Sequence, residues 1–427
     1  MFGSLMAFSI ARFWFKGWIH DLYVDPSFHF TWFGFDFIQP LPEAGMYMVF
    51  FLLFLAAICI ALGAAFRIAS ISFFVLFTYV ELLDKAPYLN HYYFVSIIAL
   101  LLCFTSANKR LSIDSLITSD KITHIPAYQV YMFIIQLALV YLFAGVAKLN
   151  SAWLLDAMPM KIWLPARADA PLIGSFLRLE ETAYLFSWMG AFYDLTIVFF
   201  LMASRTRKWA YAAVVIFHVM TWYLFQIGMF PWIMIGLTLV FFPPSAHERF
   251  WKRFERNNGT VALDIPVTPK RIVSRTFVAF LSIHFFVQLM LPLRSHWLSD
   301  NVFWDEAGYR FSWRVMLMEK AGYIHFTVVD PSSGKRKLVE PSAHLTQLQE
   351  IQMSTQPDMI LQYAAFLKAE AELAGIESPE IYAESFVSLN GKGSQRFVNP
   401  AIDLTTISPA TNRMEWLVSP DNLLVQE

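Results

Sequence analysis

Charged side chains are scarce in this sequence. Only 15% of its 427 residues are Asp, Glu, Lys or Arg, whereas soluble proteins average about 25%, and 57% are hydrophobic. Acidic and basic residues nearly balance, with a formal net charge of −1, so no basic field indicates a nucleic-acid partner. With 42 Phe among the apolar residues, these values exclude an ordinary soluble protein and predict a multi-pass membrane protein.

Cysteines and metal-ligand clusters are scarce as well. The two cysteines, Cys59 and Cys103, lie inside apolar runs, so we expect buried small hydrophobes rather than a secreted-type disulfide framework. The 10 histidines are scattered, and no pair has the HxxxH or HxxE spacing of a metal site. The sequence therefore predicts no metal.

The apolar residues gather into about nine segments near the length of roughly 20 residues that crosses a bilayer. The first segment carries Arg12 and Lys16 and has no small-residue cleavage site, so we expect a span there rather than a cleavable signal peptide. The predicted spans are 1–20, 46–65, 68–84, 91–106, 129–148, 184–204, 209–226, 228–243 and 273–292.

Basic residues favour every second connection between these spans, which indicates the cytoplasmic side. This orientation puts the N-terminus inside and everything after Pro292 outside. The 20–45 loop, by contrast, carries no Lys or Arg. The basic residues behind this orientation are Arg67, Lys109, Arg110, Lys121, Arg205, Arg207, Lys208, Arg249, Lys252, Arg253, Arg256, Lys270, Arg271 and Arg275.

From residue 293 the composition becomes that of a soluble domain. Residues 323–341 and 380–400 each predict a β-hairpin, the second with NGKG in its turn. Between them, 357–376 has apolar residues at helical spacing and a glycine stop. The predicted fold is a multi-pass α-helical membrane bundle followed by an extracytoplasmic α+β domain rich in β-hairpins. We divide it into a transmembrane helical domain, 1–292, and a soluble domain, 293–427.

One lysine, Lys148, ends the nearly uncharged segment 129–148. This placement alone fits snorkelling, in which the stem lies along lipid and the ammonium reaches the headgroups. However, Lys148 shares a helical face with Tyr141, Ala144 and Gly145, and such small residues mark a face packed on other helices. Ionisable groups inside a bundle are costly and usually functional, and a lysine away from water can present a free amine as a base. Both interpretations remain open at this point.

Two histidines stand out among aromatic residues. His218 lies in the middle of a predicted span, and His91 begins the fourth span on the predicted outer side. Taken singly, each fits a hydrogen-bonded packing residue better than a catalyst. The aromatic-rich stretch WYLFQIGMFPW (222–232) would suit a pocket for a flat, quinone-like ring, although interfacial aromatic belts explain most of the aromatic signal.

Eight segments, in order over essentially the whole chain, resemble the vitamin K-dependent gamma-carboxylase family. The membrane part of that family is called the horizontally transferred transmembrane helical (HTTM) domain. The segments are PSFHFTWFGFDFIQPLP (26–42), RIASISFF (67–74), ELLDKAPYLNHYYF (81–94), ANKRLSIDSL (107–116), VYLFAGVAKLNSAWL (140–154), FHVMTWYLFQIGMFPW (217–232), LPLRSHWLSDNVFWDEAGYRFSWRVML (291–317) and PEIYAESFVSLN (379–390).

The resemblance implies a carboxylase of the carbon–carbon lyase class, with coupled epoxidation. Its cosubstrates would be reduced vitamin K or menaquinone (a hydroquinone), O2 and CO2, without a metal. In such enzymes a lysine deprotonates the hydroquinone, O2 adds to give a strong base, and that base removes the gamma proton of a glutamyl side chain. CO2 captures the carbanion and the quinone becomes its epoxide. The expected partners are membrane lipid and a glutamate-containing peptide or protein on the extracytoplasmic side.

Site residues follow from the matching segments. Lys148 occupies the place of the family's catalytic lysine, after the same AGV. Asn108 is expected to make a polar contact to the quinone oxygen or to the base, although Lys109 follows it where animal members have a histidine. The expected pocket-lining residues for the quinone are His91, Trp153, His218 and Tyr223.

Two further departures from the animal pattern indicate a bacterial member in the inner membrane. The stretch SWRVMLMEK (312–320) lacks the family's histidine–arginine pair, and the chain ends earlier than animal carboxylases. Two alternatives stay open. The first is an epoxidase or quinone oxygenase without glutamate carboxylation, and the second is a non-enzymatic membrane protein that binds a quinone or lipid.

Overall fold

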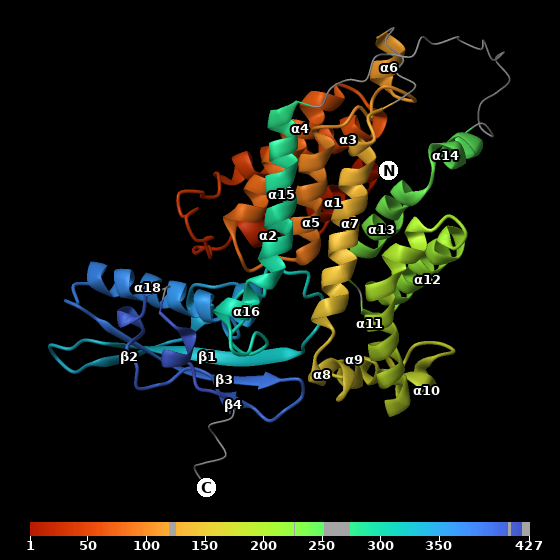
Figure 1. Cartoon of the computed structure of the whole chain (residues 1–427). Coiled ribbons are helices and arrows are strands. Elements are labelled where there is room, and N and C mark those ends of the chain that lie inside the picture. Colours follow the sequence, from red (N-terminus) through yellow and green to blue (C-terminus); the bar gives the residue numbers. More distant parts are fainter. Residues whose placement is uncertain (119–124, 226, 252–273, 409–410, 421–427) are drawn as a thin grey trace.

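The protein is described here from a computed structural model, which covers residues 1–118, 125–225, 227–251, 274–408 and 411–420. A helical bundle fills the upper part of Figure 1, and a small α+β domain lies at one end of it. Most of the basic connection 244–272 lies outside the described residues. The predicted order of a helical membrane domain followed by a hairpin-rich domain is confirmed.

Among the described residues, six helices are long and apolar enough to cross a bilayer. A bent pair, Phe230–Phe241 with Pro244–Phe250, turns by 113° and makes the count at most seven. The six helices are α3 (Glu43–Leu62), α4 (Phe66–Leu83), α7 (Tyr128–Ala147), α11 (Glu180–Met202), α12 (Arg207–Phe225) and α15 (Arg275–Leu293).

Each of the nine predicted spans contains a helix among its described residues, but fewer than nine of these helices are full-length. The apolar helices α1 (Phe2–Phe15) and α5 (Asn90–Leu102) have 14 and 13 residues, too few for a bilayer that needs about 20. Gly17, at φ 75°, separates α1 from α2 (Trp18–Tyr23), which splits the first predicted span. The eighth span is α13 (Phe230–Leu237) with the 3-10 helix η2 (Thr238–Phe241), after which the chain bends into α14 (Pro244–Trp251).

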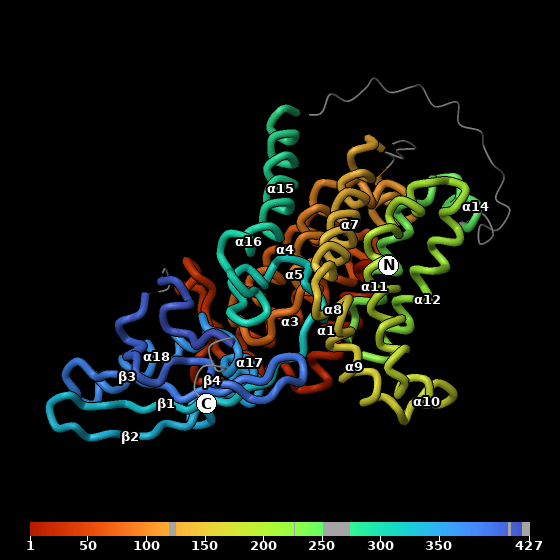
Figure 2. The backbone as a smooth tube through the Cα atoms, turned by 60° about the horizontal axis from the view of Figure 1, so that its bottom comes forward, coloured from red at the N-terminus to blue at the C-terminus, as the bar shows by residue number. Residues whose placement is uncertain are grey.

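Short helices mark the two ends of the bundle. The connection between α7 and α11 holds α8 (Ser151–Leu154), α9 (Met160–Trp163), η1 (Pro165–Arg167) and α10 (Gly174–Leu177). Figures 1 and 2 show this connection at the end of the bundle where the α+β domain lies. Figure 1 shows α6 (Ile113–Ile117) at the other end. The C-terminal end of α7 therefore faces the α+β domain.

The C-terminal domain is built on a four-stranded antiparallel sheet in the order β2-β1-β3-β4. Both predicted hairpins and the predicted helix are present. Alternate residues of β1, such as Ile324 and Phe326, are buried and pack with Tyr363 of α18 in one core. The strands are β1 (Lys320–Val329), β2 (Arg336–Val339), β3 (Glu380–Leu389) and β4 (Gln395–Arg396), and the helices are α16 (Ser295–Leu298), η3 (Pro341–Ala343), α17 (Gln347–Met353), α18 (Pro357–Leu373), η4 (Leu404–Thr406) and η5 (Arg413–Glu415).

An ion-pair cluster joins the domain to the bundle. Lys85, two residues beyond the end of α4, lies with its Nζ 2.9 Å from Asp358 Oδ2 in the first turn of α18. The Arg310 guanidinium lies 2.8 Å from the same oxygen. Burial by itself would raise the pKa of Asp358, but the charges of Arg310 and Lys85 hold that pKa well below its usual value. The cluster fixes the end of α4 against the C-terminal domain.

Candidate active site

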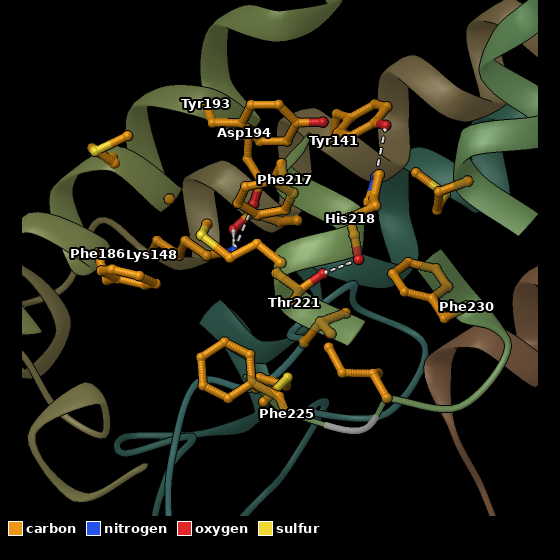
Figure 3. A pocket seen from close by; sticks show the side chains of 18 of the residues that line it. Tyr141, Lys148, Phe186, Tyr193, Asp194, Phe217, His218, Thr221, Phe225 and Phe230 are labelled. Atoms are coloured by element: carbon orange, nitrogen blue, oxygen red, sulfur yellow. Dashed lines mark hydrogen bonds and ion pairs between the residues drawn. The ribbon is translucent and has the colours of Figure 1, made fainter. Parts of the chain in front are cut away.

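A cavity of about 480 Å³ lies inside the bundle, enclosed by α7, α11, α12 and α13 (Figure 3). Its walls are mostly aromatic and aliphatic side chains. Val315 and Met316, from the segment that leads into β1, line it on the side of the C-terminal domain. The apolar wall includes Leu185, Phe186, Met189, Phe217, Phe225, Phe230 and Met234, and the polar groups at the wall come from Tyr141, Lys148, Tyr193, Asp194, His218 and Thr221.

Lys148 and Asp194 form an ion pair at the cavity wall. Lys148 Nζ lies 2.6 Å from Asp194 Oδ2 and donates a second hydrogen bond to the Ala144 carbonyl, at 3.2 Å. Only 6% of Lys148 and 5% of Asp194 are exposed, so little water competes for either charge. The ammonium also lies 5.4 Å from the centre of the Trp153 ring. These contacts exclude snorkelling, since the ammonium is held inside the bundle.

Close packing of α7 on α11 brings this pair together. Lys148 is the C-cap residue of α7, one turn beyond Ala144 and Gly145. A Cβ added at Gly145 would lie 2.8 Å from the backbone nitrogen of Leu195, the residue after Asp194. The absence of a side chain at Gly145 therefore lets the two helix backbones approach, as small residues do in membrane bundles. The sequence AGVAK places the lysine where a neighbouring helix can reach it.

A second polar group lies deeper in the cavity. Tyr141 Oη and His218 Nε2 are 3.1 Å apart, and Thr238 Oγ1 is 3.5 Å from the same hydroxyl. The His218 ring is buried, and Figure 3 shows it on a different part of the wall from the Lys148–Asp194 pair. Beside them the rings of Tyr193 and Phe217 stack with centroids 3.9 Å apart. The cavity thus offers flat apolar surfaces between two separate hydrogen-bonding positions.

The structure brings three of the predicted site residues to this cavity. Lys148, Trp153 and His218 all line it, and Trp153 is held by an indole N–H donated to the Ser187 carbonyl at 2.7 Å. His91 is buried behind the wall, with its ring 5.8 Å from that of Phe230. Tyr223 is 38% exposed and is not among the lining residues.

Asn108 lies far from Lys148. Ser106 donates its backbone N–H to Gln129, in the first turn of α7, which places this loop at the start of that helix. Lys148 follows the other end, and a helix of 20 residues is about 30 Å long. Asn108 instead donates a hydrogen bond of 2.6 Å to Asp114, and this bond lowers the pKa of the Asp114 carboxyl. The expected contact between Asn108 and the base is absent from the described structure.

Sequence reasoning did not select Asp194 or Tyr141 as site residues. The signal for Asp194 was present, because a carboxylate inside an apolar span needs a partner. Its pairing with Lys148 joins residues 46 positions apart, which no local pattern specifies. No group of three or more His, Cys, Asp or Glu positioned to hold a metal occurs in the part of the chain that the structure describes.

These features define a class: an integral membrane protein with an apolar cavity that carries a buried lysine and is closed on one side by a C-terminal domain. Residues 1–245 match the HTTM domain family, and residues 273–422 match the family described as vitamin K-dependent gamma-carboxylase, lumenal domain. The chain therefore belongs to the vitamin K-dependent gamma-carboxylase family and is a carboxylase-like membrane protein. No solved structure gives a significant match.

Proposed function

We propose that the protein is an enzyme that oxidises a reduced naphthoquinone with O2 to its epoxide and couples this oxidation to carboxylation of protein glutamate. The single observation that carries the proposal is Lys148, a buried lysine at the wall of an apolar cavity in the membrane bundle. A lipid-soluble cosubstrate reaches such a cavity from the bilayer. The glutamate substrate and its carbanion need the same shielding from water.

The residues of the cavity suit a hydroquinone. A volume of about 480 Å³ lies within the range of roughly 300–1,000 Å³ that is common for sites that take ligands of drug size. The stacked pair Tyr193–Phe217 and the ring of Phe230 offer flat surfaces for a naphthalene ring. Lys148 would meet one ring oxygen, and His218 with Tyr141 would meet the other, because the two oxygens of a hydroquinone lie at opposite ends of its ring.

In this proposal, side chains of the protein bind the hydroquinone, orient it and accept its proton. Lys148 Nζ would take the proton of the hydroxyl and then, as an ammonium, stabilise the oxyanion that remains. The aromatic wall excludes water, so that this charge interaction is stronger than in solution. Trp153 and the Ala144 carbonyl keep the lysine in place. The bound hydroquinone would supply the electrons that reduce O2 and the driving force for removing the glutamyl proton.

The glutamyl side chain would enter from the side of the C-terminal domain. Val315 and Met316 are cavity residues that belong to the C-terminal domain, in the segment that precedes β1. The distribution of basic residues among the connections favours the extracytoplasmic side for this domain. In this proposal the chain is a bacterial inner-membrane protein that acts on a peptide or protein outside the cytoplasm.

The test is an assay of the purified protein in detergent with reduced naphthoquinone, O2, labelled bicarbonate and glutamate-containing peptides. Epoxide and acid-stable label are measured separately. We expect both products, and we expect Lys148→Ala to lose both while staying folded. Lys161→Ala is the matched control, because Lys161 lies at the same end of the bundle, pairs with Glu180 and does not line the cavity.

The other outcomes separate the alternatives. If epoxide forms without acid-stable label, the protein is a quinone oxygenase that has no glutamate substrate. If neither product forms although the quinone binds, and Lys148→Ala binds it equally well, the protein is a binding protein and not an enzyme for these substrates.

A further inference from the structure

We infer that Asp194 is the final acceptor of the hydroxyl proton, so that the base is the Lys148–Asp194 pair and not Lys148 alone. This inference rests on the proposed function, because it concerns how that reaction starts. It assigns Asp194 a positioning and proton-holding role that acts through the lysine.

The starting point is the state of Lys148 in the ion pair. An ammonium whose proton is shared with a carboxylate 2.6 Å away has no free lone pair and cannot accept another proton. Before Lys148 can act as a base, one proton must leave it. Asp194 is the nearest acceptor and is itself buried, with its only described hydrogen-bond partner being Lys148.

The other titratable groups at the cavity are less suited to take that proton. They are Tyr141, Tyr193 and His218, contributed by α7, α11 and α12. His218 already shares its Nε2 with the Tyr141 hydroxyl and has no described contact with Lys148. The segments that approach from the C-terminal domain and from α9 contribute Val315, Met316 and Met160, which do not titrate. Asp194 is therefore the acid–base partner of Lys148 among the residues described.

The protons are transferred in two steps. In the first, one proton passes from Lys148 Nζ to Asp194 Oδ2, which converts an ammonium and a carboxylate into an amine and a carboxylic acid. In the second, the amine takes the proton of the ligand hydroxyl, which leaves an ammonium beside an oxyanion. In sum, one O–H bond breaks on the ligand and one forms on Asp194, no electrons are transferred, and the net charge of the cavity stays at zero.

Burial and hydrogen-bond counting both favour this path. In an apolar cavity the free energy of an ion pair is closer to that of the neutral amine–acid pair than it is in water, because desolvation raises the free energy of both charges. The ammonium has three N–H donors, and Asp194 and the Ala144 carbonyl take two of them. One donor direction therefore remains for a ligand oxygen in the cavity that Lys148 lines.

The experiment compares Asp194→Asn, Asp194→Glu and the control Asp156→Asn, an exposed aspartate in the connection after α7. Epoxide formation is measured against pH, and hydroquinone binding is measured separately. We expect Asp194→Asn to bind hydroquinone but to lose about 100-fold or more in turnover near neutral pH, within the range that a general base contributes. Its rate should gain a pH dependence that the wild-type rate lacks, because the Lys148 proton must then leave to solvent.

The conservative variants keep the test decisive. Asp194→Glu should recover a tenth or more of the wild-type rate with the wild-type pH profile. Lys148→Arg should bind but not turn over, since a guanidinium does not give up its proton. Wild-type turnover and pH profile in Asp194→Asn would overturn the inference, and so would a folded, binding-competent Asp194→Glu as inactive as Asp194→Asn.

The proposed function and the role of Asp194 can fail separately. If the wild-type protein forms epoxide and Lys148→Ala does not, the proposed function stands whatever the Asp194 variants do. If the wild-type protein forms no epoxide, the proposed function fails first and the Asp194 variants have no rate to change.

Discussion

Tyr141 and His218 meet across helices α7 and α12, with the tyrosine hydroxyl 3.1 Å from Nε2 of the imidazole. This hydroxyl is the described partner of the ring nitrogen, so it fixes how the imidazole edge is presented to the cavity. The contact lies away from the Lys148–Asp194 pair on the cavity wall (Figure 3). The two groups can therefore be tested independently.

Tyr141→Phe removes the hydroxyl and keeps the ring. We expect the KM for hydroquinone to rise several-fold with kcat changed by less than about threefold, because the variant loosens a ligand contact and leaves the base intact. Unfolding free energy should fall by about 1 kcal/mol, the usual value of one hydrogen bond. Tyr211→Phe is the control, since its hydroxyl bonds the Ile235 carbonyl and it does not line the cavity. A large fall in kcat with an unchanged KM would contradict this assignment.

Two glycines offer a matched pair of variants for the α7–α11 contact. A Cβ at Gly145 would lie 2.8 Å from the Leu195 backbone nitrogen, whereas a Cβ at Gly190 would lie 3.7 Å from Trp153 and 3.9 Å from Lys148 Cε. Gly145→Ala must push the helices apart, so we expect it to lower the unfolding free energy by about 1–3 kcal/mol and to reduce epoxide formation strongly.

Gly190→Ala should keep the unfolding free energy of the wild type, because its new methyl group makes only ordinary contacts. Unfolding in denaturant and initial epoxide rates check both variants. If Gly145→Ala and Gly190→Ala had the same unfolding free energy and the same epoxide rate, the close approach of α7 and α11 would not be what holds the ion pair.

Asn108→Ala tests the site residue that the structure separates from the cavity. Asn108 bonds Asp114, and Asp114 in turn accepts the N–H groups of Ala65 and Phe66 at the start of α4. We therefore expect a lower melting temperature with epoxide turnover within about twofold of wild type. A loss of turnover in a folded variant would restore the sequence-based assignment of Asn108 to the chemistry.

The contrast between Asn108 and Lys148 shows what the sequence could and could not predict. Helices and hairpins follow from local periodicity and turn residues, and these were confirmed over the bundle and the C-terminal domain. The number of full spans did not follow from the pattern, because the left-handed backbone at Gly17 and the bend between Phe230–Phe241 and Pro244–Phe250 interrupt apolar segments. A hydropathy pattern does not reveal where an apolar helix stops short.

Contacts between distant residues could not be predicted from one sequence. The small-residue face of Lys148 indicated burial, and the structure bears that out. It did not indicate which helix would cover that face, because Asp194 and Leu195 belong to a span 46 or more residues away. Asn108 was assigned by a match of short segments, and a match of this kind carries no information about which end of a helix a loop occupies.

The junction of the two domains should be sensitive to acid. The pKa of Asp358 is depressed in the folded protein, because the charges of Arg310 and Lys85 outweigh the effect of burial. A carboxyl with a depressed pKa contributes its full stabilisation above the unfolded value of about 3.9 and loses it as the pH falls towards the folded value. We therefore expect the thermal stability of the wild-type protein to fall below about pH 4.

Asp358→Asn should remove this contribution, so that its melting temperature is lower than wild type at neutral pH and the two converge in acid. Glu377→Gln, at an exposed position beyond α18, is the control and should follow the wild-type curve. Hydrogen exchange at the end of α4 reports the same junction, since Lys85 is held there by Asp358. If the melting temperatures of Asp358→Asn and wild type changed in parallel with pH, this ion-pair cluster would not stabilise the contact between bundle and domain.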